Sequence, residues 1–147
     1  MQFFRPSIDV VKPILKAAGL PTDDLPEQLD GFLACGDPTR PDGVVGLQIF
    51  STDALLRSLV VAETVRERGI GRSLVAAAEG LAVQRGVSRG FLLTDTAEGF
   101  FAALGYRSVD RQVAPGPIRN SRQYSELCPA SAALMLREIG GPAASID

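Results

Sequence analysis

The stretch that decides the fold runs from Leu55 to Arg85 and reads LLRSLVVAETVRERGIGRSLVAAAEGLAVQR. Its first part belongs to a run over 54–62 that is rich in β-formers, and only one arginine and one serine interrupt its apolar character. Such a run predicts a central strand that is buried on both faces. A polar, glycine-containing loop follows over 63–71. Beyond the loop, apolar residues at helical spacing predict a helix that ends at Gly86: Leu74, Val75, Ala78, Leu81 and Ala82.

The loop of this strand, loop and helix unit has the composition of an anion site. Backbone N–H groups that converge at a helix N-terminus favour a pyrophosphate, and Gly69 and Gly71 let the backbone approach closely. Arg66, Arg68 and Arg72 add positive charge there. A dinucleotide fingerprint needs a third glycine, which is absent, and a P-loop needs Gly-Lys-Ser/Thr, whereas the chain has Gly-Arg-Ser. The alternative is a tight turn that needs glycine and binds nothing.

The residues before this unit predict one helix and three strands. A short strand opens the chain at 2–5, and a helix follows with Ser7 or Asp9 as its N-cap. Strands are expected at 31–36 and 44–50. The residues between them, DPTRPDG at 37–43, have turn chemistry throughout, so we expect an antiparallel hairpin with a long loop. The buried face of the helix comprises Val10, Val11, Ile14, Leu15 and Ala18.

The residues after the unit complete a single domain. We expect a buried strand at 90–94, a short helix at 97–104 with Thr96 as its N-cap, and a strand at 106–112. A polar, arginine-bearing segment then leads to a last strand at 132–139. With 147 residues, the chain predicts one domain over 1–141 and a disordered tail over 142–147.

Composition excludes several classes of function. The sequence has no histidine, which removes Ser-His and Cys-His nucleophile pairs and His-bearing zinc sites. Its net charge of -2 argues against nucleic acid or an anionic membrane as the main partner. The apolar runs are too short to span a bilayer. Cys35 and Cys128 cannot form a four-thiolate site, and the start of the chain has no signal-peptide pattern, so we expect reduced thiols, a cytoplasmic location and no metal.

Two motifs carry a resemblance to a known family. Residues 66–71 read RERGIG, after the expected strand, and residues 97–106 read AEGFFAALGY. They resemble the Arg/Gln-x-x-Gly-x-Gly/Ala loop and the Ala-x-x-Phe-Tyr-x-x-x-Gly-Phe segment of the GNAT superfamily of acetyl-CoA-dependent acetyltransferases, at the usual distance. More narrowly, LLRSL at 55–59, LLTDTAEGFF at 92–101 and LCPASA at 127–132 are similar to the ArsN-type N-acetyltransferases of bacterial arsenic-resistance operons.

This resemblance implies an α/β (α+β) fold. The expected GNAT architecture is a mixed central sheet of six to seven strands, splayed between the fourth and fifth strands and flanked by about four helices. Acetyl-CoA would lie in the gap, with a backbone N–H near Leu59 or Val60 on the thioester carbonyl. The residues that the resemblance assigns to acetyl-CoA are Leu59, Val60, Val61, Arg66, Glu67, Arg68, Gly69, Ile70, Gly71, Arg72, Ser73, Thr96, Phe100 and Phe101.

The sequence departs from the family pattern at two positions. Many relatives have a tyrosine that protonates the leaving thiolate where this chain has Phe101, and a carboxylate often stands where this chain has Arg57 and Ser58. Because coenzyme A is a good leaving group, we expect slower or differently assisted chemistry and no covalent enzyme intermediate. Ser58, Tyr124 and Cys128 are the candidate replacement acids; with Leu59 and Val60, Ser58 and Tyr124 form the catalytic set that we predict.

Arg57 needs a partner, because an unpaired charge in an apolar strand is costly. We expect either a salt bridge to Asp95 or Glu98, or contact with an anionic substrate group such as a carboxylate or arsonate. The substrate set that we predict is Arg57, Ser58, Thr94, Arg119, Arg122 and Cys128.

The resulting expectation is an N-acetyltransferase that acts on the amine of a small, anionic, amino-acid-like molecule, with an organoarsenical such as arsinothricin as one candidate. The alternatives are an acetyl-CoA-binding or regulatory module that has lost turnover, and an enzyme that acetylates protein N-termini or lysines. Many members of the family pair through their C-terminal strands, so a homodimer is expected.

Overall fold

The computed structural model describes residues 1–127 and 131–140. Cys128 and the tail expected at 142–147 lie outside the described residues. The chain divides into two compact units, each built from two segments. The first unit comprises Met1–Leu47 and Arg57–Gly80, and the second comprises Gln48–Leu56 and Leu81–Asp147. Two strands and one helix contribute residues to both units.

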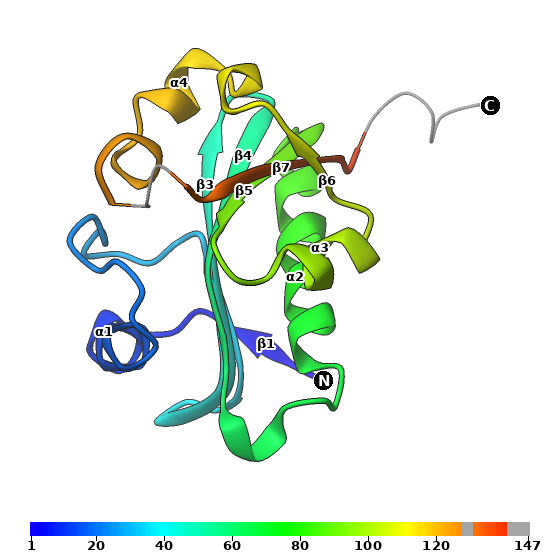
Figure 1. The fold of residues 1–147 in the computed structure, drawn as a ribbon. Coiled ribbons are helices and arrows are strands. Elements are labelled where there is room, and N and C mark those ends of the chain that lie inside the picture. The colour runs from blue at the N-terminus through cyan, green and yellow to red at the C-terminus, as the bar shows by residue number, and fades with distance from the viewer. Residues whose placement is uncertain (128–130, 141–147) are drawn as a thin grey trace. The chain divides into compact units, whose positions relative to one another are not determined.

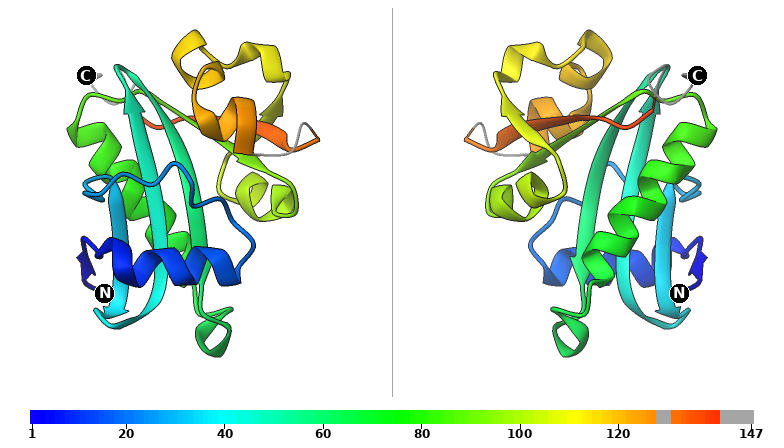
Figure 2. Two further views of the ribbon diagram at one scale, coloured as in Figure 1. Left: turned by 90° about the vertical axis from the view of Figure 1, so that its left-hand side faces the viewer. Right: turned by 90° about the vertical axis from the view of Figure 1, so that its right-hand side faces the viewer.

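The first unit contains the N-terminal strands and one helix on each face of them. Its elements are β1 (Phe3–Phe4), α1 (Ile8–Ala17), β2 (Phe32–Asp37), most of β3 (Arg40–Phe50), the second half of β4 (Asp53–Val61), η1 (Glu63–Val65) and most of α2 (Ile70–Gln84). β1 pairs antiparallel with β2, and β2 pairs antiparallel with β3. Figure 2 shows α1 crossing one face of these strands and α2 lying on the opposite face.

An apolar cluster fixes α1 on its face. Val11 and Leu15, one helical turn apart, are fully buried and pack with side chains of β2 and β3. Ile14 of α1 and Val60 of β4 also pack against this cluster, so Val11, Ile14 and Leu15 of the predicted helix face point toward the strands, whereas Ala18 is exposed. The described core of this unit comprises Val11, Leu15, Leu29, Phe32, Ala34 and Val44.

The second unit contains the C-terminal strands and short helices. Besides the end of β3, the first part of β4 and the last turn of α2, its elements are β5 (Arg89–Thr94), α3 (Glu98–Ala103), β6 (Arg107–Val109), η2 (Arg111–Val113), α4 (Gly116–Arg119), the π-helical segment η3 (Gln123–Leu127) and β7 (Ala133–Glu138). Its apolar core combines Leu55 of β4, Phe91 of β5 and Ile118 of α4, which are almost completely buried, with residues of β7. The α4 segment labelled in Figure 1 is therefore anchored by its isoleucine.

The strands form one mixed sheet in the order β1-β2-β3-β4-β5-β7-β6. β4 and β5 are parallel, whereas β7 is antiparallel to both of its neighbours. The parallel pairing runs only from Asp53↔Arg89 to Leu56↔Leu92, although β4 continues to Val61. The expected mixed sheet of six to seven strands, splayed between the fourth and fifth, is therefore confirmed with seven strands, and the helices α1 to α4 match the expected four.

The long hairpin loop expected at 37–43 is wrong. β2 ends at Asp37 and β3 begins at Arg40, which is its register partner. Asp37 Oδ1 accepts hydrogen bonds from the backbone nitrogen and the hydroxyl of Thr39, at 2.8 and 2.7 Å, and this local arrangement closes a two-residue turn. A shift of register just before Gly36, whose φ is 93°, lets the remaining turn-forming residues enter the strand.

Two expectations about the second unit are also corrected. Thr96 is not the N-cap of α3: Ala97 occupies that position without a side-chain cap bond, and its N–H donates to the hydroxyl of Thr94 at 3.0 Å. The strand expected at 106–112 is shorter, because Asp110 accepts a hydrogen bond from the Gln112 nitrogen at 2.9 Å and starts a 3-10 turn.

Candidate functional site

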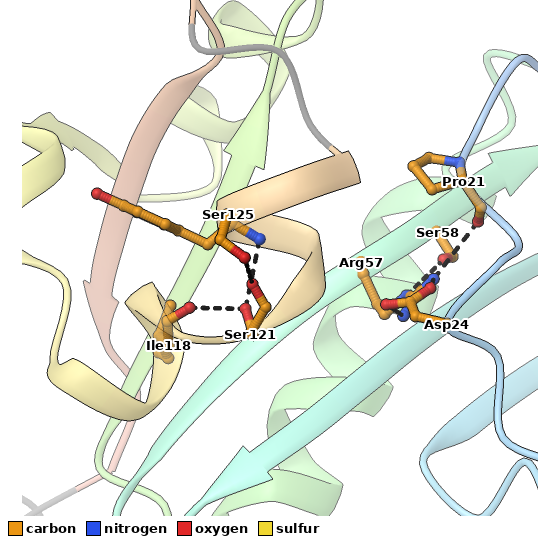
Figure 3. Close-up of polar contacts among 8 residues, drawn as sticks. Pro21, Asp24, Arg57, Ser58, Ile118, Ser121 and Ser125 are labelled. Carbon is orange, nitrogen blue, oxygen red and sulfur yellow. Dashed lines mark hydrogen bonds and ion pairs between the residues drawn. The ribbon is translucent and has the colours of Figure 1, made fainter.

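β4 is interrupted in its middle by Ser58, which has a φ of 60°. The Nε of Arg57 donates a hydrogen bond to the Ser58 hydroxyl at 2.9 Å (Figure 3). Consecutive side chains of a regular strand point to opposite faces, so a contact between neighbours shows that the alternation is broken here. The break lies two residues after Leu56, the last β4 residue that pairs with β5. Leu59 and Val60, the expected thioester contacts, come immediately after it.

Arg57 is held in a buried ion pair with Asp24. Its two terminal nitrogens lie 2.6 and 2.8 Å from the two carboxylate oxygens, and the exposed fractions of the side chains are 1% and 7%. Arg57 also donates to the carbonyl oxygen of Pro21 at 3.4 Å and lies 5.8 Å from the centroid of the Phe32 ring. The partner expected from the sequence, Asp95 or Glu98, is therefore wrong, because a residue between α1 and β2 supplies the carboxylate.

Gly46 makes room for this arrangement. A Cβ at this position would lie 2.6 Å from the Phe32 ring and 3.0 Å from Cγ of Arg57. The glycine of β3 thus allows both side chains to pack over the strand beside the ion pair.

The loop between β4 and α2 has two residues in the left-handed backbone region. Glu67 has a φ of 67° and Gly69 a φ of 77°. α2 begins at Ile70, and its first hydrogen bond runs from the Ser73 nitrogen to the Gly69 carbonyl oxygen at 3.0 Å. The N–H groups of the first helical turn have no intrahelical acceptor, so they are directed at whatever lies before the helix. N–H groups arranged in this way are able to bind an anion such as a pyrophosphate.

The charge around this loop is mixed but favours an anion. The side chains of Arg66, Arg68 and Arg72 are exposed, and the first turn of α2 has no acidic residue. Arg66 Nε donates to the carbonyl oxygen of Val61 at 3.3 Å, and its guanidinium lies 3.8 Å from the exposed carboxylate of Glu63. Arg66 therefore contacts the end of β4, whereas the side chains of the other two arginines face solvent.

A pocket of about 330 Å³ lies within the first unit, beside the C-terminal end of β4. Three of the residues predicted to bind the cofactor, Val60, Val61 and Arg66, line it. α1 contributes Ile14, which the sequence assigned to the buried face of the helix. The pocket has the volume of a small-molecule binding site. The full lining is Ile14, Ala17, Ala18, Pro41, Gly43, Val44, Val60, Val61, Ala62, Glu63 and Arg66.

In the second unit, α3 carries the two phenylalanines predicted to contact acetyl-CoA. Phe100 is partly exposed, whereas Phe101 is 7% exposed. The Phe101 ring packs edge to face against both Phe100 and Tyr106, with ring centroids 5.0 and 5.8 Å apart. Phe101 thus has a packing role at the position where the resemblance implies a tyrosine.

Tyr124 of η3 is fixed by Arg111. Its hydroxyl donates to the Arg111 carbonyl oxygen at 2.6 Å, and the guanidinium of the same arginine lies 4.5 Å from the centroid of the ring. Arg119, at the end of α4, and Arg122 are exposed. Cys128, predicted in the substrate set, lies outside the described residues.

The sequence missed Asp24, which lies 33 positions before Arg57. The signal for it was indirect, since an arginine in an apolar strand predicts a carboxylate without locating it.

Among the described helices, none combines the length and the apolarity needed to cross a bilayer. In the same part of the chain, no group of three or more acidic or cysteine side chains is placed to hold a metal ion.

Comparisons with known proteins identify the family. The family model of the acetyltransferase (GNAT) domain matches residues 29–108, which is more than half of the chain. An uncharacterized N-acetyltransferase of Chlorobaculum tepidum is 42% identical over 65 residues, which are 44% of this chain and 41% of that protein. The match thus spans about two fifths of the relative's length.

Two solved structures share the fold at low identity. The N-acetylglutamate synthase from Neisseria gonorrhoeae, complexed with coenzyme A and N-acetyl-glutamate, is 18% identical, with a TM-score of 0.79 over 95% of this chain and 35% of that one. Rv2747 from Mycobacterium tuberculosis, in complex with coenzyme A, is 18% identical, with a TM-score of 0.72 over 94% of this chain and 99% of that one. With the match to the family model, these likenesses lead to one conclusion: the chain belongs to the GNAT acetyltransferase domain family.

Proposed function

We propose that this chain is an acetyl-CoA-dependent N-acetyltransferase that transfers the acetyl group directly to an amine. The observation that carries the proposal is a succession of features in the first unit. β4 breaks at Ser58, and the loop before α2 has left-handed residues at Glu67 and Gly69. Backbone N–H groups after the break, at Leu59 or Val60, suit a thioester carbonyl, and those of the loop suit a pyrophosphate.

The residues of the loop fit acetyl-CoA. When bound, acetyl-CoA supplies an activated acetyl group on a good leaving thiolate. Arg68 and Arg72 offer exposed positive charge at the start of α2, and Gly69 leaves open space where a side chain would stand. The mild negative net charge of the chain is thus compatible with a local anion site.

The role of β4 in the chemistry is electrostatic. Fixed N–H donors at Leu59 or Val60 polarise the carbonyl and favour attack by a neutral amine, which needs no histidine. Phe101 has no proton to donate, and the Tyr124 hydroxyl already donates to a backbone carbonyl. Ser58, whose hydroxyl accepts from Arg57 at the break, is the side chain that we assign as a proton carrier, with water as the alternative.

We infer that the acceptor is a small anionic molecule that resembles an amino acid. Arg119 and Arg122 are exposed and suit a carboxylate or arsonate. The structural relative complexed with N-acetyl-glutamate is consistent with an acceptor of this class. The similarity of three sequence stretches to the ArsN-type enzymes makes an organoarsenical amino acid such as arsinothricin one candidate within it.

Binding of acetyl-CoA is tested first, by calorimetry. The Arg68→Gln/Arg72→Gln double variant should weaken acetyl-CoA about tenfold, since two exposed charges contribute about 1.4 kcal/mol together. S-acetylpantetheine, which lacks the pyrophosphate, should bind both proteins equally. Arg85→Gln, at the other end of α2, is the matched control and should bind like the wild type. Failure of the wild type to bind acetyl-CoA would overturn the proposal.

Turnover is tested by thiol release across a panel of amines that contains anionic amino acids, an organoarsenical amino acid, and peptides with free N-termini or lysines. Release with the anionic amino acids supports the proposed acceptor. Release only with peptides favours a protein acetyltransferase. Phe101, which has no ionisable group at the expected tyrosine position, favours a second candidate, an acetyl-CoA-binding module. Binding without release on any amine would support that candidate.

A further inference from the structure

We propose that Asp24 is a positioning residue that acts through Arg57 to set the backbone of β4 at Ser58. The inference rests on the proposed function, because its consequence is the direction of the N–H groups that contact the thioester. Asp24 lies between α1 and β2, before the residues that match the family model. Its effect reaches β4 by side-chain contacts within the first unit, shown in Figure 3.

The contact between Asp24 and Arg57 is a buried two-point ion pair. Both carboxylate oxygens are bonded to the terminal nitrogens of the guanidinium, at 2.6 and 2.8 Å, in the planar two-point geometry that restricts rotation most strongly. The pair is buried, so water does not compete for these bonds. The bond to the Pro21 carbonyl and the Phe32 ring fix the plane further.

The third nitrogen of the same guanidinium carries the constraint to the strand. Once the terminal nitrogens are fixed on Asp24, Nε has one direction in which to donate, and the Ser58 hydroxyl occupies it at 2.9 Å. A left-handed conformation is unfavourable for a residue with a Cβ, and such residues persist where surrounding contacts over-determine them. Ser58 is therefore held at a φ of 60° by a contact that depends on Asp24.

This arrangement replaces the direct role that the sequence allowed for Arg57. The face of the guanidinium that would receive a substrate carboxylate is occupied by Asp24. Buried ion pairs are often no more stabilising than apolar residues of the same size, so stability alone gives little reason for one at this position. A position next to the break in β4 gives a functional reason.

Isotope-edited infrared spectroscopy of bound acetyl-CoA, labelled at the thioester carbonyl, measures the proposed effect without an acceptor. Hydrogen bonds to the carbonyl lower its stretching frequency. We expect a lowered frequency in the wild type and loss of most of the lowering in Asp24→Asn, while the acetyl-CoA dissociation constant changes by less than about threefold because the 66–72 loop is intact. Asp53→Asn, which breaks the Asp53–Arg89 pair at the start of β4, is the matched control and should keep the wild-type frequency.

Two further variants separate positioning from folding. Asp24→Leu/Arg57→Met removes both charges without leaving a buried ion alone, so it should fold while losing the frequency shift. Glycine adopts a positive φ without strain, so Ser58→Gly added to Asp24→Asn should recover part of the shift. A pair that only stabilises the fold would show no such recovery.

The outcomes distinguish the two proposals. If the wild type does not bind acetyl-CoA, the proposed function fails and this inference fails with it. If acetyl-CoA binds but the carbonyl frequency in the wild type equals that in solution, or is lowered equally in Asp24→Asn and in the apolar double variant, only the positioning role is overturned. Loss of the shift in both variants, with recovery by glycine and none in Asp53→Asn, supports it.

Discussion

The hydroxyl of Tyr124 donates a hydrogen bond of 2.6 Å to the backbone carbonyl oxygen of Arg111. The guanidinium of Arg111 in turn donates to two backbone carbonyl oxygens, that of Tyr124 at 3.3 Å and that of Ala132 at 2.9 Å. These bonds connect η2, η3 and the approach to β7. The hydroxyl proton of Tyr124, a candidate acid in the sequence analysis, thus takes part in a structural hydrogen bond.

Tyr124→Phe should lower stability and spare catalysis. Loss of one hydrogen bond costs about 1 kcal/mol, which corresponds to a fall of about 2–4 °C in melting temperature for a chain of this size. The turnover number per folded molecule should stay within about twofold of the wild type, because the proton is not used in the reaction. A tenfold loss of turnover at unchanged melting temperature would instead make Tyr124 the acid.

Gly69→Ala should weaken acetyl-CoA without unfolding the protein. The space around this position is open, so the penalty is the left-handed conformation, about 1–2 kcal/mol, and not a clash. Relief of this strain by rearrangement of the loop should raise the dissociation constant by about 5- to 30-fold. Calorimetry and thermal unfolding measure the two effects.

Gly80→Ala is the control for that substitution. Gly80 lies in the interior of α2, also with open space around it, and alanine there should stabilise the helix by about 0.5–1 kcal/mol. Acetyl-CoA should bind it as it binds the wild type. Equal affinities in the two alanine variants would contradict an anion site in the 66–72 loop.

Thr94→Val should destabilise α3, and Thr96→Val should not. The hydroxyl of Thr94 accepts from the Ala97 nitrogen, and removal of a capping oxygen costs about 1 kcal/mol. Thr96 is exposed and holds no cap bond of this helix. Thermal unfolding of the two variants compares them directly, and the reverse order of melting temperatures would restore Thr96 as the cap.

The Cys35 thiol should resist modification at neutral and mildly alkaline pH. Burial raises its pKa, and the nearby Asp42 carboxylate raises the pKa further. The folded protein therefore favours the neutral thiol. The contribution of this thiol to the free energy of unfolding is present below the pKa of the unfolded thiol, and it is lost as pH rises through the higher pKa of the folded state. In a Cys128→Ser background, an aromatic disulfide reagent should react slowly with the native protein at pH 8 and fully in denaturant. Equal rates would contradict the burial.

Residue type and spacing along the sequence were enough to predict the strand and helix on either side of the glycine loop. The β-rich run before Ala62 and the helical spacing after Gly71 each have one good interpretation, and the structure confirms both. Prediction from residue type and spacing failed where one residue changes the backbone geometry of its neighbours. The bulge at Gly36 brought Pro41 and Gly43 into a strand, although their composition predicts a turn.

The candidate site likewise has one part that follows from local sequence and one part that does not. The loop and helix start from Arg66 to Ser73 are contiguous, so residue types and spacing predict a glycine-containing loop that leads into a helix, although not the left-handed conformation of Glu67. The environment of Arg57 depends on contacts between residues far apart in sequence, and neither its partner nor the left-handed conformation of Ser58 has a local signature, since serine is not a residue that favours positive φ.

The ion pair of Arg57 joins a residue outside the family-model match to a strand inside it. Arg57 lies inside the segment that matches the family model, whereas Asp24 lies before it. On the proposed role of Asp24, a connecting segment outside the family-model match adjusts a strand inside it. Exchange of residues 19–28 alone would then change the reactivity of the domain, while every residue that we propose to bind acetyl-CoA stays the same.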